Sequence, residues 1–148
     1  MPKHAEPAAA IIDPTPCNCL ALRQAARHIS QLYDQHLAEV GLRTTQYSIL
    51  SKLSRLGAMP IGKLAATMVM ERTALSRAIG PLERDGMVKV GAGPNGRTRS
   101  VKLTPTGETR LKAAAAHWRR AQKEFEIAVG AADAADLRTV LQHVISVT

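Results

Sequence analysis

Apolar residues recur at steps of three and four along most of the chain, which is the spacing of one face of an α-helix. The first such stretch runs from residue 17 to about residue 40 and stops at Gly41, a residue type that often ends helices. A second stretch begins at Thr44, whose hydroxyl suits a helix N-cap, and stops at Gly57. The pattern predicts two consecutive helices here.

Two further helical stretches follow. A short one opens at Pro60, because proline suits the first turn of a helix. The next covers residues 71–85, and three of its apolar residues share one face: Leu75, Ile79 and Leu82. Pro81 cannot donate a backbone hydrogen bond, so a bend is expected in the second half of this helix.

After Gly86 the spacing changes from helical to alternating. Residues 87–90 and 100–103 each alternate apolar and polar side chains, as half-buried strands do. Residues 91–96 between them are glycine, proline, asparagine and alanine, which are mostly turn formers. The segment therefore predicts a β-hairpin.

Thr104 and Pro105 restart the helical pattern, which is interrupted at Gly130 and then continues to the end of the chain. The expected fold class is mainly α with a small β-hairpin, in the order of a winged helix-turn-helix domain flanked by terminal helices. The expected organisation has four parts: a flexible N-terminal arm (1–16), a dimerisation helix (17–42), a winged helix-turn-helix DNA-binding domain (43–104) and C-terminal dimerisation helices (105–148).

The composition indicates which classes of partner the chain can bind. Lys and Arg number 20 against 12 Asp and Glu, a net charge of +8, which indicates an anionic partner such as nucleic acid, anionic membrane or acidic protein. Aromatic residues are only 3% of the chain, so aliphatic side chains must fill the core. No apolar run approaches the roughly 18 residues that a membrane span needs, and the short run 8–12 is broken by proline and aspartate. With two cysteines there is no disulfide framework, so we expect a cytoplasmic protein.

Candidate DNA contacts cluster on two predicted elements. The polar side of helix 71–85 carries hydroxyls and guanidinium groups, which can contact base edges and phosphates in a major groove. Arginines near the hairpin tip can follow the backbone or enter a minor groove. The candidate DNA-binding residues are Lys63, Arg72, Thr73, Ser76, Arg77, Arg97 and Arg99.

Several segments in this order resemble the core of the MarR family of winged helix-turn-helix transcriptional regulators: Leu64-Ala65, Leu75-Ser76-Arg77, residues 82–86, Arg97 and residues 101–107. Each segment is weak alone, and the combination is specific. The resemblance covers residue 17 to the C-terminus and implies a bacterial DNA-binding regulator. One departure is Asn95, which stands where the family commonly has an aspartate two residues before the wing arginine.

The first helix and the last two have apolar stripes that a small winged domain cannot cover, and the resemblance implies that they interleave between two subunits. A twofold homodimer places two recognition helices about 34–36 Å apart, which predicts a palindromic operator in double-stranded DNA. The expected function is a repressor that a small-molecule effector releases from this operator.

The family's effectors are often small anionic aromatic compounds bound between the dimerisation helices and the winged domain. Candidate effector-pocket residues are Arg23, Arg27, His28, Tyr33, His117 and Trp118. The alternative to effector binding is, for each of these residues, a purely structural role. For Trp118 this role is packing in the core or the dimer interface. No cofactor is expected.

Cys17 and Cys19 stand at the start of the predicted first helix, a position that favours a redox-reactive thiol. Cys19 resembles the position of the reactive cysteine in the organic-hydroperoxide-sensing branch of the family, although Arg23 and Thr44 stand where that branch has tyrosines. Redox sensing is therefore one alternative function, and plain packing is the other interpretation of the two thiols. No second ligand pair is spaced to complete a zinc site.

A nonspecific architectural DNA-binding protein is the second alternative, since the same basic surface would serve it. An enzyme is not expected: the five histidines lack metal-ligand pairing, and neither a Gly-x-Ser-x-Gly elbow nor a phosphate-binding glycine loop occurs. A membrane-surface role for the basic helices is disfavoured because large apolar anchors are scarce near them.

Overall fold

The computed structural model describes residues 15–147, so most of the predicted N-terminal arm lies outside the described residues. The elements in chain order are α1 (Asn18–Leu37), the 3-10 turn η1 (Ala38–Val40), α2 (Thr44–Leu56), β1 (Met59–Pro60), α3 (Ile61–Met68), α4 (Arg72–Arg84), β2 (Val88–Ala92), β3 (Arg99–Leu103), α5 (Pro105–Val129) and α6 (Ala131–Val147).

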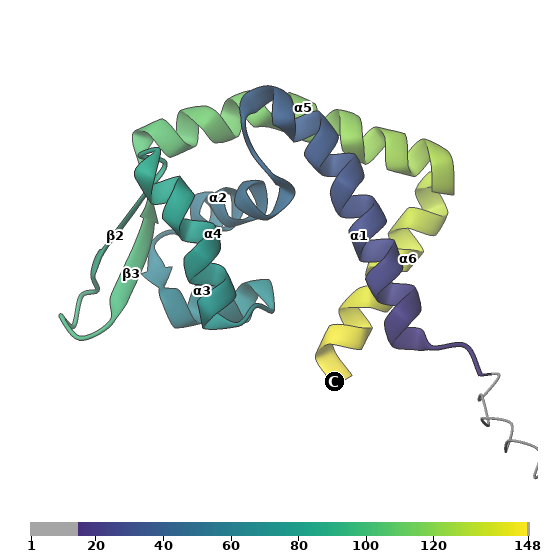
Figure 1. Ribbon diagram of the computed structural model, residues 1–148, viewed down its shortest axis with the longest axis horizontal. Helices are drawn as coiled ribbons and strands as arrows, with labels where there is room; N and C mark the ends of the chain where they lie inside the picture. The colour runs from purple at the N-terminus through teal and green to yellow at the C-terminus, as the bar shows by residue number, and fades with distance from the viewer. Residues whose placement is uncertain (1–14, 148) are drawn as a thin grey trace, which may run out of the picture.

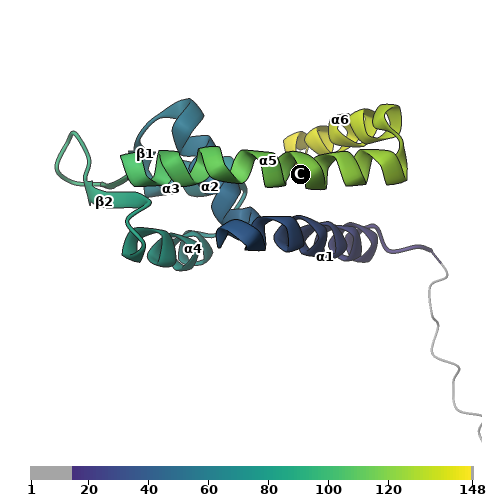
Figure 2. The same ribbon diagram turned by 90° about the horizontal axis from the view of Figure 1, so that it is seen from above.

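The molecule has two regions joined by the long helix α5. Helices α2, α3 and α4 and the sheet gather at the N-terminal end of α5, whereas α1 crosses α5 and α6 folds back beside its C-terminal end (Figure 1). Seen from above, α1 and α4 lie on one side and α5 on the other (Figure 2). Within the described part of the chain, no helix is long and apolar enough to cross a membrane.

The core lies in the region formed by α2, α3, α4 and the sheet, called here the winged region, and it is aliphatic, as the composition predicted. It brings together side chains from α1, α2, β1, α3, α4, β2 and β3, with Ala114 of α5 completing it. Its large members are Leu37, Leu42, Ile49, Leu50, Leu53, Met59, Leu64, Leu75, Ile79, Leu82, Met87, Val88 and Val101. The predicted inner face of helix 71–85 is confirmed, because all three of its apolar residues are buried.

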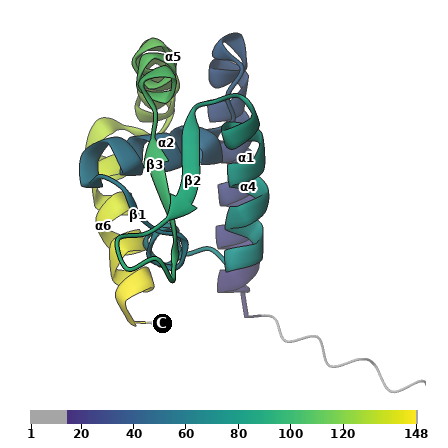
Figure 3. The same ribbon diagram turned by 90° about the vertical axis from the view of Figure 1, so that its left-hand side faces the viewer.

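The sheet has three antiparallel strands in the order β1-β3-β2, one more than the predicted hairpin. β1 pairs with β3 through Met59 and Val101, and β2 pairs with β3 from Val88 opposite Leu103 to Ala92 opposite Arg99. The β2–β3 hairpin is the wing. Viewed from its side of the molecule, β2 lies beside α4 and α5 passes above the hairpin (Figure 3). The predicted turn 91–96 was placed too early, since Gly91 and Ala92 belong to β2.

Two predicted helix starts need correction. Arg43, not Thr44, is the N-cap residue of α2, and the Thr44 backbone N–H donates to the Asp34 carboxylate of α1 over 2.7 Å. Pro60 lies in β1 and is the N-cap of α3, which begins at Ile61, one position after the predicted start. Thr104 does cap α5, because its hydroxyl accepts from the Gly107 N–H.

Candidate nucleic-acid interface

α4 is amphipathic, with a buried apolar face and an exposed polar one. Leu75 and Leu82 are 0% exposed, and Ile79 is 4% exposed. All four predicted contact residues on this helix are exposed: Arg72, Thr73, Ser76 and Arg77. The helix continues past Pro81 to Arg84, so the proline does not end it. This arrangement presents hydroxyl and guanidinium groups on a helix that the core holds rigidly.

The two arginines of α4 that are candidate DNA contacts, Arg72 and Arg77, lie in different surroundings. The Arg72 guanidinium lies against Gly62 at the start of α3, whereas Arg77 borders a hollow on the opposite flank of α4. Lys63, next to Gly62 in α3, is exposed as predicted. α3 and the start of α4 therefore carry two exposed cations, Lys63 and Arg72, with the exposed Glu71 just before Arg72 in the chain.

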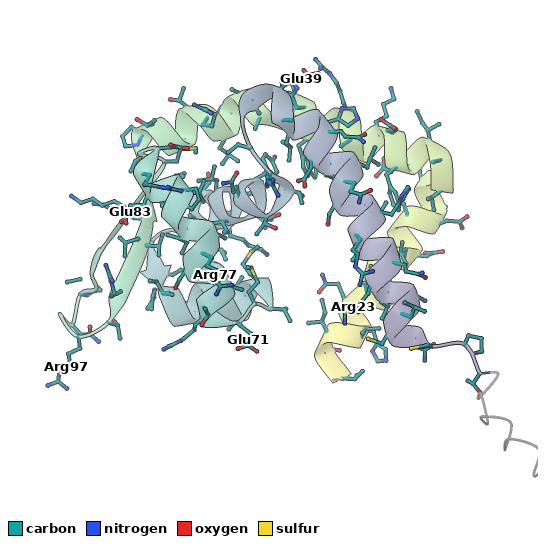
Figure 4. The ribbon with its side chains drawn as sticks, viewed as in Figure 1. Arg23, Glu39, Glu71, Arg77, Glu83 and Arg97 are labelled. Atoms are coloured by element: carbon teal, nitrogen blue, oxygen red, sulfur yellow. The ribbon has the colours of Figure 1, made fainter. Side chains whose placement is uncertain are left out.

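The wing tip is organised by Asn95. Its side-chain oxygen accepts from the backbone N–H groups of Arg97 (3.0 Å) and Thr98 (3.2 Å) and from the Thr98 hydroxyl (3.2 Å). Asn95 therefore fixes the turn through the backbone instead of clamping the arginine side chain. Arg97 is exposed at the tip and points away from the molecule (Figure 4). Arg99 is also exposed, but it begins β3 and is not in the turn.

Glu83 connects the wing to α4. Its carboxylate accepts a hydrogen bond from the Val90 N–H over 3.1 Å. Val90 lies on β2, an edge strand of the sheet, so Glu83 satisfies a backbone donor that pairing leaves free. The wing and α4 are thus held in a fixed relation.

A hollow that the sequence did not reveal lies where α1, the start of α2 and α4 meet. It has a volume of about 380 Å³ and is lined by Ser30, Asp34, Arg43, Thr44, Thr45, Gln46, Arg77, Ala78 and Pro81. Arg43 and Arg77 bring two positive charges to it from different elements. No single segment carried a signal for this site, because its lining comes from three separate parts of the chain.

The predicted effector-pocket residues are not gathered in one cavity of the described structure. Arg23 and Arg27 are exposed on α1, and Arg23 lies toward the end of that helix opposite η1 (Figure 4). His28 lines a separate shallow groove between α1 and the end of α5. His117 and Trp118 lie farther back along α5, where α5 meets η1 and α2.

The contacts of these residues connect helices. His117 Nδ1 lies 3.1 Å from Glu39 Oε2, without the alignment of a hydrogen bond. Trp118 stacks on Tyr47, with ring centroids 5.9 Å apart. The Tyr33 hydroxyl donates to the side-chain oxygen of Gln122. In this chain three of the six predicted residues thus join α1, η1 or α2 to α5.

Both tyrosines of the chain have a raised pKa. Burial is the main cause for Tyr33, the Glu126 carboxylate adds to it, and Arg138 opposes it. Burial also raises the pKa of Tyr47, while Arg119 opposes the shift. Each hydroxyl therefore stays protonated to a higher pH than a free tyrosine.

Cys17 is the N-cap residue of α1, and its sulfur accepts from the Leu20 N–H over 3.4 Å. Cys19 is the second residue of the helix, and both thiols are free and exposed. Within residues 15–147, no cluster of three or more His, Cys, Asp or Glu side chains is arranged to hold a metal ion.

Comparisons with known proteins agree with this geometry. The sequence model of the MarR family matches residues 42–97. A crystal structure of the M. tuberculosis transcriptional regulator MosR in complex with DNA is 35% identical, covers 88% of this chain and 95% of its own, and superposes with a TM-score of 0.80. The uncharacterized HTH-type regulator YwoH of Bacillus subtilis (strain 168) is 29% identical over 91 residues, which is 62% of this chain and just under two thirds, 66%, of that protein.

An E. coli MarR mutant complexed with operator DNA shares the fold, with a TM-score of 0.76 at 20% identity over 85% of this chain and 91% of its own. The family match falls on the winged region, and the similarity to MosR extends over nearly the whole chain. The chain therefore belongs to the MarR family of transcriptional regulators.

Proposed function

We propose that this regulator binds a palindromic operator in duplex DNA as a homodimer, through α4 and the wing, and that it acts as a repressor in the bacterial cytoplasm. The observation that carries the proposal is the exposed polar face of α4 directly opposite its buried apolar face. The net charge of +8 supplies the long-range attraction to DNA. The related MosR structure, which is bound to DNA, supports the same use of the fold.

Arg77 is the strongest candidate for base recognition. It is exposed on α4, and a guanidinium can form two parallel hydrogen bonds with the O6 and N7 acceptors of guanine. Thr73 and Ser76 add hydroxyls that donate to bases or phosphates. Arg97 at the wing tip suits a narrow minor groove, where the negative potential is enhanced.

Dimerisation is supported by apolar side chains that the single chain leaves uncovered. Leu20 and Leu22 of α1 are 51% and 42% exposed, and α6 exposes Val140 (58%) and Val147 (63%). Such residues on terminal helices, away from the core, form the kind of surface that a second copy covers. A twofold axis through these helices would space the two α4 helices for a palindrome.

Release by an anionic effector is supported by the hollow between α1, α2 and α4. Its volume is within the range of small-molecule sites, and two arginines line it. An aromatic carboxylate bound there would pair with Arg77 and withdraw this side chain from DNA. Benzoate should then weaken operator binding of the wild type, and Arg43→Gln should reduce the effect. No effect of benzoate or other small aromatic acids on operator affinity would contradict this part of the proposal.

The alternative trigger is thiol oxidation. Cys17 and Cys19 are exposed and two positions apart, and side chains at this spacing do not face each other on a helix. A disulfide would therefore require the first turn of α1 to unwind and would remove the sulfur from its capping bond with Leu20. In this reaction the two thiols lose two protons and two electrons to an organic hydroperoxide, which becomes an alcohol and water. Reversible loss of operator binding after peroxide, absent in Cys17→Ser, would favour this trigger.

The test of the proposal is a fluorescence-anisotropy titration with the intergenic DNA that flanks the protein's own gene, with random duplex as control. We expect at least about a thousandfold preference for one site, with two chains per site. Equal affinity for both duplexes, with a steep dependence on salt, would contradict the proposal and favour a nonspecific architectural protein.

A further inference from the structure

The Arg72 guanidinium occupies the space that a side chain at residue 62 would take. Gly62 is the second residue of α3, and Arg72 is the first residue of α4. A Cβ atom added to Gly62 would lie 2.3 Å from Arg72 Nη2, 3.1 Å from Cζ and 3.2 Å from Nε. Because three atoms of one guanidinium lie this close to the point, the guanidinium packs against the backbone of Gly62 where a side chain would stand.

Arg72 lies on a different part of the α4 surface from Thr73 and Arg77, although Ser76 lies one turn along on the same side. At about 100° per residue, Arg72 lies on the edge of the buried face next to Ile79, whereas Thr73 and Arg77 are turned well away from that face. Arg72 is exposed and makes no ion pair with a carboxylate among the residues that the structure describes. Its charge is thus held at α3, against the residue that precedes the exposed Lys63 in the chain, and is available to an anionic partner.

We infer that Gly62 is a positioning residue of the DNA interface. Because Gly62 has no side chain, the Arg72 guanidinium can pack against α3, and in this position Arg72 contacts a backbone phosphate instead of a base. The inference rests on the proposed function. An arginine that is held in place before binding loses less side-chain entropy when it binds. The contact with Gly62 therefore raises the affinity for DNA. A phosphate contact carries no sequence information and contributes about one unit to the slope of log affinity against log salt.

The test compares Gly62→Ala, Arg72→Ala and the double variant on operator and random duplex over a range of salt. Each single variant should bind about 2- to 10-fold more weakly, by the same factor on both duplexes, and the salt slope of Arg72→Ala should fall by about one. The double variant should bind no more weakly than Arg72→Ala, since both changes remove one interaction. Lys112→Ala is the control, because it removes one positive charge from α5, outside α3, α4 and the wing, and it should bind both duplexes like the wild type.

Gly62→Ala should fold normally, because alanine favours helix and only the flexible end of Arg72 must move. Wild-type affinity in Gly62→Ala would overturn the inference, and so would a loss by Arg72→Ala confined to the operator. The Nε–Hε NMR signal of Arg72 tests the contact between Arg72 and Gly62 in the absence of DNA, and it should shift in Gly62→Ala. An unshifted signal would show that Gly62 does not position Arg72 and would overturn the inference. Failure of the wild type to prefer any duplex would overturn only the proposed function.

Discussion

The Asp34 carboxylate of α1 accepts a hydrogen bond from the backbone N–H of Thr44, the first residue of α2, over 2.7 Å. A residue of the first helix thus satisfies one of the free donors at the start of the second. Arg110 of α5 donates to the Val40 carbonyl over 2.8 Å at the same junction. The proposed dimerisation helix and the winged region are therefore joined by directed polar contacts as well as by apolar packing.

Asp34→Ala should destabilise the fold by about 0.5–2 kcal/mol, because it removes the acceptor at the start of α2. The measurement is urea unfolding followed by circular dichroism. Asp34→Asn is the control, since an amide oxygen still accepts the bond, and it should lose less. An Asp34→Ala protein as stable as the wild type would show that the contact contributes nothing.

Leu75→Ala should cost about 2–5 kcal/mol of unfolding free energy, because the side chain is 0% exposed and its removal leaves a cavity in the core. Thr73→Ala, two residues earlier on the exposed face of α4, should change stability by less than about 0.5 kcal/mol. The pair is compared by chemical denaturation. Equal losses in the two variants would contradict the assignment of the two faces.

The tyrosine titration should lie above the ordinary pKa of 10, because burial raises the pKa of both Tyr33 and Tyr47. In the unfolded chain these hydroxyls ionise first, so stability is unaffected below pH 10 and falls as the pH rises from there toward the raised values. Absorbance near 295 nm follows the titration, and Tyr33→Phe should remove one of the two raised steps. A native titration centred at or below pH 10 would be inconsistent with the buried positions.

Val140→Asp should convert the proposed dimer to a monomer, because it places a charge on the apolar stripe of α6 that includes the exposed Val147. Gln142→Asp, on the opposite side of the same helix, is the control and should leave the dimer intact. Sedimentation equilibrium distinguishes the two states. A Val140→Asp protein that stays dimeric would place the interface elsewhere.

Local patterns were sufficient for most of the fold. The helical spacing of apolar residues, the glycines that end helices and the change to alternation after Gly86 predicted the order of elements. The resemblance to the MarR family and the expectation of a regulator rather than an enzyme are confirmed. β1 was missed because two residues have no periodicity, and its pairing partner Val101 lies far along the chain. The cap of α2 was misassigned because its acceptor, Asp34, belongs to the preceding helix.

The candidate site was only partly predictable. The exposed face of α4 follows from the helical period alone, so Thr73, Ser76 and Arg77 could be selected from sequence. The contact of Arg72 with Gly62 and the hollow lined by Arg43 depend on how helices pack, and no local pattern encodes that. The assignment of all these residues to DNA contacts stays a prediction.

The most direct test of α4 as the recognition helix is the affinity of Arg77→Ala and Arg97→Ala for operator and for random duplex at several salt concentrations. Arg77→Ala should lose about 1–3 kcal/mol on the operator and much less on random DNA, because a base contact exists only at the right sequence. Arg97→Ala should weaken both complexes and lower the salt slope by about one. An equal loss of binding free energy on both duplexes for Arg77→Ala would contradict the account. It would mean that α4 contacts the phosphate backbone through Arg77 and does not read bases with it.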